Sequence, residues 1–155
     1  AVTVQQVRSR AKRLHRKHNL GVLIVDYLAL MRPDKRGENR TREVTEITAA
    51  LKGLAKELGI PVIALSQLNR EMAKRASGLP MLSDLRESGS IEQDADVVIF
   101  IHRPEVGEHD EDKRLAVQGQ ALLIVAKQRN GETGNIKAHY DGRFTLFSEV
   151  GGLGY

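Results

Sequence analysis

The stretch GVLIVDYLALM, residues 21–31, decides the fold class of this chain. It is an almost unbroken apolar run, too short and too rich in β-branched residues for a helix, and it is typical of a strand buried on both faces of a sheet. The stretch PVIALS, residues 61–66, indicates a second such strand. Between them, apolar residues recur at spacings of three and four from Val44 to Leu58, which predicts an amphipathic helix ended by Gly59. This order of strand, helix and strand predicts a parallel βαβ unit.

The remainder of the chain continues the alternation of helices and strands. Apolar residues with helical spacing follow a capping box at Thr3 and Gln6, and this helix is expected to end at Asn19. The whole pattern predicts an α/β fold, with a mostly parallel sheet flanked by helices and a C-terminal antiparallel hairpin. The other predicted elements are a short helix at residues 69–76, a capping box at Ser90 and Gln93, strands at 97–101 and 121–126, a mobile loop at 104–119, and hairpin strands at 135–141 and 143–148.

Composition narrows the class of protein. The chain has 155 residues, which suits one domain spanning residues 1–155. Cysteine is absent, which excludes a disulfide scaffold, a thiolate zinc site and a cysteine nucleophile, and fits a reducing compartment. No apolar run approaches the ~20 residues that cross a bilayer, so we expect a cytoplasmic protein without membrane contact.

The positive charge is concentrated at one end of the chain. Residues 1–18 hold six basic and no acidic residues, whereas the rest holds 18 basic and 20 acidic residues, and the net charge is +4. The chain is therefore not a uniformly basic nucleic-acid binder. The basic face of the first helix is interpreted as a solvated surface, with local nucleic-acid contact as the alternative.

Polar residues follow the predicted strands, at the edge where α/β sheets bind ligands. Asp26 interrupts the first apolar run, and an acid there is costly unless it is paired or faces a cation. It is either a Walker B-type residue that holds the Mg²⁺ of a nucleoside triphosphate, or a capping or salt-bridged acid. Gln67 follows the second strand, and its amide can hydrogen-bond both a γ-phosphate and an attacking water, or it is an ordinary loop residue.

Two cations follow the strand predicted at residues 121–126. Lys127 and Arg129 are two positions apart, so on an extended chain they project to the same side. An arginine there can act as an arginine finger in the nucleotide site of a neighbouring subunit. The alternative interpretation is an edge strand protected by charge.

Four strings, taken together and in this order, resemble the C-terminal ATPase domain of the bacterial replicative DNA helicases, the DnaB family. The resemblance covers about residues 3–148, and the third string is the most specific. The strings are LIVDYLALM (residues 23–31), VIALSQLNRE (62–71), SDLRESGSIEQDADVVIFIHR (83–103) and AKQRNGETG (126–134).

This resemblance implies a RecA-like fold, assembled as a homo-hexameric ring that binds ATP and Mg²⁺ between subunits. It further implies a helicase that couples ATP hydrolysis to translocation on single-stranded DNA, with a helicase loader and primase as expected partners. The residue roles it implies are Asp26 as the Walker B magnesium residue, Gln67 as the γ-phosphate sensor, Lys127 and Arg129 as residues that reach the ATP of the adjacent subunit, and Arg86, Glu87 and Gly89 as the DNA-binding loop.

One family motif is missing. No G-x-x-x-x-G-K-[ST] phosphate loop occurs in the chain, and in the family this loop lies upstream. We therefore expect the later part of an ATPase domain, lacking the phosphate-loop strand between the strands that end near Gln67 and Ile101, and inactive by itself. The alternatives are a non-catalytic fragment that retains only oligomer or DNA contacts, and a recombinase-type RecA relative.

Overall fold

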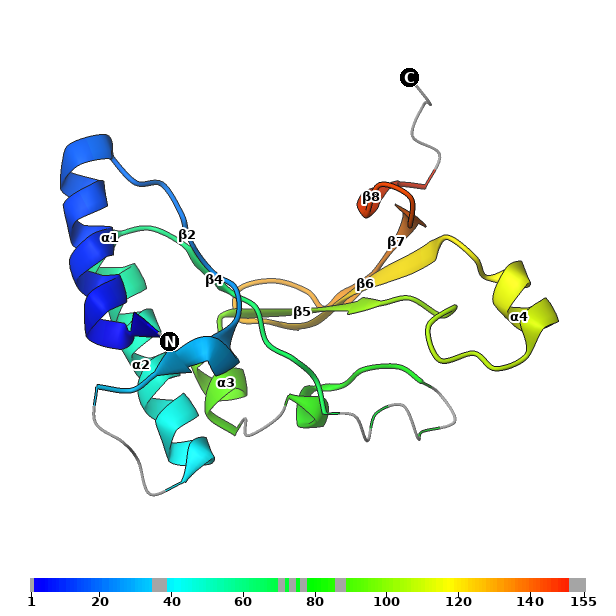
Figure 1. The fold of residues 1–155 in the computed structure, drawn as a ribbon, viewed down its shortest axis with the longest axis horizontal. Coiled ribbons are helices and arrows are strands. Elements are labelled where there is room, and N and C mark those ends of the chain that lie inside the picture. Colours follow the sequence, from blue (N-terminus) through cyan, green and yellow to red (C-terminus); the bar gives the residue numbers. More distant parts are fainter. Residues whose placement is uncertain are drawn as a thin grey trace. The chain divides into compact units, whose positions relative to one another are not determined.

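The computed structural model describes residues 2–34, 39–69, 72, 75, 78–85 and 89–150 (Figure 1). The chain divides into two compact units, residues 1–69 with 85–95 and residues 70–84 with 96–155. The first unit contains the strands β1 (Val2–Thr3), β2 (Leu23–Val25), β3 (Met31–Arg32) and β4 (Val62–Ala64), and the helices α1 (Val4–His18), α2 (Arg40–Leu58) and α3 (Gly89–Asp94). The second contains β5 (Val97–His102), α4 (Glu111–Ala116), β6 (Gln120–Gln128), β7 (Gly134–Asp141) and β8 (Leu146–Glu149).

Helices α1 and α2 begin and end at the residues that the sequence predicts or close to them. The predicted capping box of α1 is confirmed, because the Thr3 side chain accepts from the Gln6 backbone N–H and the Gln6 side chain accepts from the Thr3 backbone N–H. Asn19 ends α1 and Gly59 ends α2, both in the left-handed conformation that stops a helix. Helix α2 starts earlier than its apolar repeat, since Asn39 caps it by accepting from the Arg42 N–H.

The predicted parallel βαβ unit is present, in shorter form. Strands β2 and β4 pair in parallel, with Val25 opposite Ala64, and β1 and β3 form a second parallel pair. The prediction that the first strand is buried on both faces is wrong. Ile24 is 59% exposed and Ile63 is 52% exposed, because side chains alternate along a strand and no described residue covers this face.

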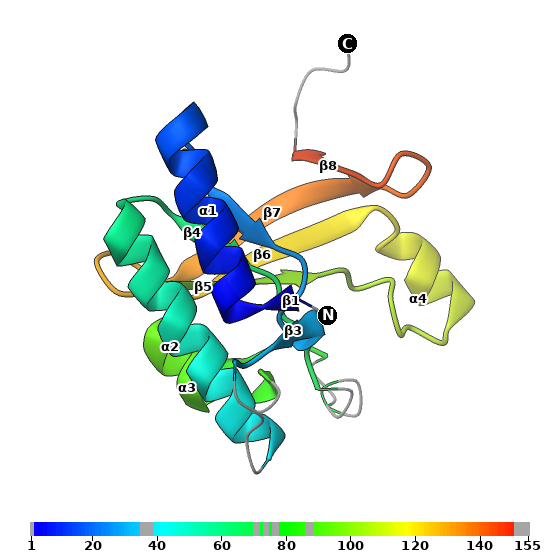
Figure 2. The ribbon, with the colours of Figure 1, turned by 60° about the vertical axis from the view of Figure 1, so that its left-hand side comes forward.

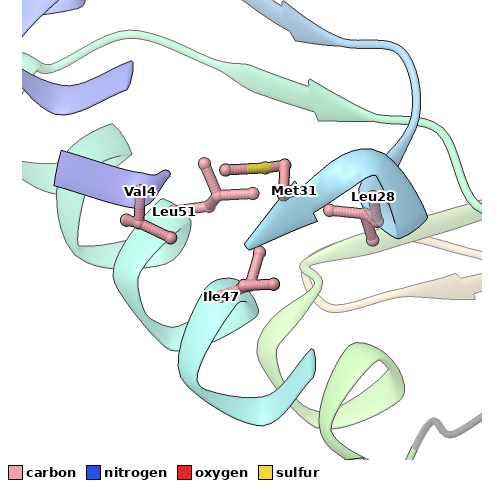
Figure 3. Packing of buried hydrophobic residues seen from close by; sticks show 5 residues of the cluster. All are labelled: Val4, Leu28, Met31, Ile47 and Leu51. Carbon is pink, nitrogen blue, oxygen red and sulfur yellow. The ribbon is translucent and has the colours of Figure 1, made fainter. Parts of the chain in front are cut away.

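The opposite face of the β2–β4 pair packs on the core of the first unit. The buried cluster there consists of one residue of α1, two of α2, and two of the segment between β2 and the end of β3, as Figure 3 shows. Val25, Val62 and Ile91 pack against it, so β2, β4 and α3 share this core. Its buried members are Val4, Leu28, Met31, Ile47 and Leu51.

The second unit is built on one antiparallel sheet with the strand order β5–β6–β7–β8, visible in Figure 2. The predicted hairpin at residues 130–134 is confirmed as the connection between β6 and β7. Strand β6 lies between β5 and β7, but its pairing with β7 covers only Gln120–Val125. Its charged end at Lys127 pairs with β5 alone, so an edge protected by charge stays an alternative interpretation of this end. Residues 104–119 are not only a loop, since α4 forms there with Asp110 as its cap.

The predicted α/β fold class is confirmed, with parallel strands flanked by helices and antiparallel strands at the C-terminal end. The antiparallel part is a four-stranded sheet and not a single hairpin. Among the described strands, β4 pairs with β2 alone, which agrees with the expectation of a missing neighbouring strand. The short helix predicted at residues 69–76 falls largely outside the described residues. No helix in the described ranges is long and apolar enough to span a bilayer.

Candidate functional site

The parallel pairing of β2 and β4 brings Asp26 and the segment that contains Gln67 to the same edge of the sheet. Asp26 follows Val25 directly, and Gln67 comes three residues after Ala64, the register partner of Val25. Backbone bonds continue past the strands, since the Leu65 N–H donates to the Val25 carbonyl at 2.9 Å. The sequence-predicted meeting of these residues at one sheet edge therefore agrees with the register.

Both side chains at this edge reach solvent. Asp26 and Gln67 are exposed, so neither is used in packing the core of the unit. The turn after Asp26 is fixed by the Leu28 N–H, which donates to the Leu65 carbonyl at 2.9 Å. The peptide bond between Asp26 and Tyr27 is cis. An exposed carboxylate and an exposed amide, held by adjacent strand ends, are available to an external ligand.

One backbone contact joins the residue after Gln67 to the residue before the predicted DNA-binding loop. Leu68 forms an isolated antiparallel bridge with Leu85. Of the loop residues that follow, Arg86 and Glu87 lie outside the described residues, whereas Gly89 is the first residue of α3. The capping box predicted at Ser90 and Gln93 does not form as expected, because α3 has already started at Gly89.

Lys127 and Arg129 lie in the second unit, at the end of β6. Lys127 is the penultimate residue of β6, and the Arg129 N–H donates to the Asp96 carbonyl at 2.8 Å, which prolongs the ladder by one position. The Arg129 guanidinium also pairs with the Asp96 carboxylate at 3.6 Å, and both side chains are more than half exposed, at 53% and 55%. In this chain Arg129 is thus held by a solvent-exposed ion pair.

The oxygen ligands at the sheet edge could bind Mg²⁺ only together with the phosphates of a nucleotide. No group of three or more His, Asp or Glu side chains in the described part of the chain could hold a metal ion. Mg²⁺ keeps several waters and often takes just one or two carboxylates together with substrate phosphates. A single exposed carboxylate at Asp26 fits that mode and does not fit a metal cage made by protein alone.

Two hydrogen-bonded carboxylates near the predicted DNA-binding loop were missed by the sequence analysis. Asp94, which is half-buried, accepts a 2.6 Å hydrogen bond from the hydroxyl of Thr48 on α2. Asp84, which is buried, accepts from the Arg75 guanidinium and, at 2.8 Å, from the Met81 N–H. Both aspartates belong to the most specific string, residues 83–103, but their partners come from segments that spacing alone could not identify.

A second polar cluster lies at the other end of the antiparallel sheet. The Arg103 guanidinium stacks over the Tyr140 ring at 3.8 Å and pairs with Glu105. The Gly119 N–H donates to the second oxygen of Glu105 at 2.9 Å, and these hydrogen bonds from Arg103 and then Gly119 lower the pKa of the Glu105 carboxyl. Through Glu105, this cluster joins the residues that precede α4 to Gly119, which follows it.

Residues 1–149 match the protein family described as DnaB-like helicase C terminal domain. The chain belongs to this family. It is 50% identical over 163 aligned residues to the replicative DNA helicase DnaB of Rickettsia typhi, and the alignment covers 97% of the chain and 33% of that protein. It is 48% identical to the corresponding helicase of Buchnera aphidicola, over 100% of the chain and 33% of that protein.

Solved structures give the same result. A DnaB-like replicative helicase studied in its interactions with primase superposes with a TM-score of 0.86 at 35% identity, over 96% of this chain and 36% of that one. A second solved structure, of an ATPase domain, superposes with a TM-score of 0.85 at 36% identity, over 96% of this chain and 51% of that one. The chain spans about a third of the length of the curated relatives. The predicted family is confirmed, and it is favoured over the recombinase-type alternative.

Proposed function

We propose that the complete protein is a replicative DNA helicase that couples ATP hydrolysis to translocation on single-stranded DNA and duplex unwinding, in a homo-hexameric ring. The observation that carries the proposal is the parallel register of β2 and β4, which end next to Asp26 and three residues before Gln67, in a chain of the DnaB-like family. The relatives named above are replicative helicases, and this chain matches a third of their length.

At the sheet edge, the exposed side chains of Asp26 and Gln67 bind different parts of the Mg²⁺–nucleotide complex. Asp26 holds Mg²⁺ directly or through water, because an oxygen ligand suits this hard cation. Gln67 hydrogen-bonds the γ-phosphate, because its amide is neutral and offers both a donor and an acceptor. When bound, Mg²⁺ would supply positive charge next to the transferring phosphoryl group. Asp26 and Gln67 thus bind and orient Mg²⁺ and the γ-phosphate. The phosphate loop belongs to the part of the domain that lies upstream in the family.

The hairpin end of β6 acts on the nucleotide of the adjacent subunit. Lys127 and Arg129 stabilise the negative charge of the transferring phosphoryl group in trans. To do so, Arg129 leaves Asp96, and an exposed ion pair of this kind is worth only ~0–1 kcal/mol. The Asp96 contact is therefore a weak resting position that a phosphate displaces easily.

The DNA contacts belong to three residues around the start of α3. Arg86 pairs with a phosphate, Gly89 allows close approach of the backbone, and Glu87 contributes through its backbone N–H because its carboxylate repels phosphate. Gly89 is exposed at the start of α3, with open space where a side chain would stand. Primase and a helicase loader are proposed as partners, the first because a structural relative was studied in its interactions with primase.

The decisive experiment replaces Arg129 in the full-length helicase. Arg129→Ala should abolish DNA-stimulated ATP hydrolysis, a loss of about 10³-fold or more for a trans arginine, and leave ATP binding intact. Arg114→Ala is the matched control, since Arg114 is an exposed arginine of α4 in the same unit. Turnover equal to the wild type in Arg129→Ala would contradict the finger role.

The second candidate is a non-catalytic fragment that retains only oligomer or DNA contacts. It is favoured by the absence of a G-x-x-x-x-G-K-[ST] motif from the 155 residues. ATPase assays of the 155-residue chain and of the complete domain distinguish a fragment that lacks only the phosphate loop from a protein without catalytic activity. We expect no turnover by this chain and full turnover once the upstream half of the domain is supplied.

A further inference from the structure

Helix α1 carries an exposed stripe of positive charge that neither the core nor the proposed nucleotide site uses. Arg10, Arg13 and Lys17 are separated by three and four residues, so they lie on one face of the helix, and Arg16 lies beside them. All four residues are exposed, whereas the two buried residues of α1 lie on a different face. Arg10, Arg13, Arg16 and Lys17 are called the α1 stripe below.

The other cations of α1 are neutralised by helix α2, which runs beside it (Figure 2). Glu57 of α2 pairs with Arg8 at 2.9 Å and also with Lys12, and these contacts, the hydrogen bond from Lys12 foremost, lower the pKa of the Glu57 carboxyl. A second carboxylate, Asp34, accepts from the Gln5 N–H at 3.1 Å. No described residue forms an ion pair with the α1 stripe, so its charge is not balanced within the first unit.

The α1 stripe is unfavourable for the helix that carries it. Like charges three or four positions apart destabilise a helix, and Arg13 has such neighbours in Arg10, Arg16 and Lys17. The negative end of the helix dipole offsets the repulsion in the last turn, which contains Arg16 and Lys17, but the effect of the dipole does not extend beyond that turn. The dipole therefore does not account for Arg10 and Arg13, and a bound anion would relieve the repulsion along the whole stripe.

The chemistry of the α1 stripe favours a nucleic-acid backbone over an acidic protein surface. Three of its four residues are arginines, whose forked guanidinium matches the geometry of a phosphate. Protein interfaces depend on buried apolar anchors, and Leu14, at 43% exposure, is the one large apolar side chain of α1 that is exposed. From Arg10 to Lys17 the helix rises by about 10 Å, a length over which duplex DNA carries roughly six phosphates. Several cations can thus contact phosphates at once.

We propose that the α1 stripe binds the phosphate backbone of DNA, as a contact separate from the residues around the start of α3. The inference does not rest on the nucleotide site, because exposed cations bind phosphates without ATP or Mg²⁺. Contacts of this kind position a protein on DNA and carry no information about its sequence. The stripe therefore holds DNA of any sequence against the outer face of α1.

The test neutralises the stripe in the full-length helicase and measures DNA binding without nucleotide. The variant combines Arg10→Gln, Arg13→Gln and Lys17→Gln, and fluorescence anisotropy gives its affinity between about 50 and 200 mM salt, a range over which phosphate contacts weaken strongly. Two probes distinguish the form of DNA that is bound. One is a dumbbell duplex closed at both ends, which offers no free single strand, and the other is a single-stranded oligonucleotide.

The expected result is a shallower dependence of affinity on salt. Each phosphate contact contributes ~0.9 to the slope of log affinity against log salt on duplex DNA, and ~0.7 on single strands. Loss of three contacts should therefore reduce the slope by ~2.7 on the dumbbell or by ~2.1 on the oligonucleotide. For the dumbbell, the wild type should lose about 40-fold more affinity than the variant over the fourfold rise in salt.

The matched control removes the same charge from the second unit. It combines Lys113→Gln, Arg114→Gln and Arg143→Gln, three exposed cations that pair with nearby acids. This control should keep the wild-type slope on both probes. An equal change of slope in the two triple variants would overturn the proposal. An unchanged slope on both probes in the stripe variant would also overturn it and leave the stripe to solvent or to an acidic protein.

Two further measurements separate binding from folding. Arg10→Lys combined with Arg13→Lys keeps the charge and should keep the wild-type salt slope. The glutamine variant should unfold at no less urea than the wild type, because glutamine is a good helix former and the repulsion within α1 is reduced. A lower urea midpoint, together with a lost slope in the lysine variant, would assign the stripe a structural role and refute the proposal. A wild-type helicase without DNA-stimulated ATP hydrolysis would contradict the proposed function, while the salt slope would still decide the role of the stripe.

Discussion

Replacing Ile47 by alanine tests how the stability of the first unit is distributed. Ile47 is 1% exposed and belongs to the core cluster. The substitution deletes about three carbon groups, worth ~0.8 kcal/mol each on transfer, and leaves a cavity. We expect unfolding to become easier by about 3.5 kcal/mol, within the range of roughly 2–5 kcal/mol for such changes. That is a large share of a typical domain stability of about 5–15 kcal/mol.

The matched control is Ile24→Ala, the same chemical change on the exposed face of β2. Because Ile24 is 59% exposed, it should cost only about 1 kcal/mol. Urea unfolding is followed by circular dichroism at 222 nm, which reports mainly on α1 and α2, the two long helices of the first unit. With a slope of ~2 kcal/mol per molar urea, the two midpoints should differ by about 1 M or more. Equal midpoints would refute the assignment of the core to one face of the sheet.

Two further outcomes follow from the local contacts. Thr3→Ala removes one half of the capping box of α1 and should cost about 1 kcal/mol in the same unfolding assay, whereas Thr41→Ala, inside the first turn of α2, serves as a comparison and should cost less. The Arg143 side chain and backbone N–H lower the pKa of Asp141 to about 2, below its value of roughly 3.9 in the unfolded chain. The contribution of this pair is therefore complete above about pH 4 and is lost as the pH falls through 2, and Asp141→Asn should flatten that acid-side loss in a pH series of thermal melts.

Structural elements that depend only on residues adjacent in the sequence could be predicted. The capping box at Thr3, the left-handed stop at Gly59 and the hairpin after β6 all follow from the preferences of a few adjacent side chains. Helix α4 also has a local signal in Asp110, but the charged, glycine-containing composition of the surrounding segment indicated a loop. Burial could not be read in the same way, since an apolar strand shows what it can bury and not which face is covered.

In the candidate site too, some contacts could be predicted from the sequence and others could not. Asp26 and Gln67 could be placed at one edge, because parallel pairing alone fixes where strand ends meet. The bond between Thr48 and Asp94 joins positions 46 residues apart, and no periodicity links them. The resting contact of Arg129 with Asp96 depends on the antiparallel register of β5 and β6, which the sequence analysis did not predict.

The second edge of β4 has a practical consequence. Among the described strands only β2 pairs with β4, and the side chains of Ile63 in β4 and of Leu65 directly after it are exposed. An unprotected edge next to apolar side chains is a template on which another molecule can add a strand. Preparations of the isolated chain should therefore form β-rich aggregates at high concentration, and charged substitutions at Ile63 or Leu65 should slow the rise in light scattering.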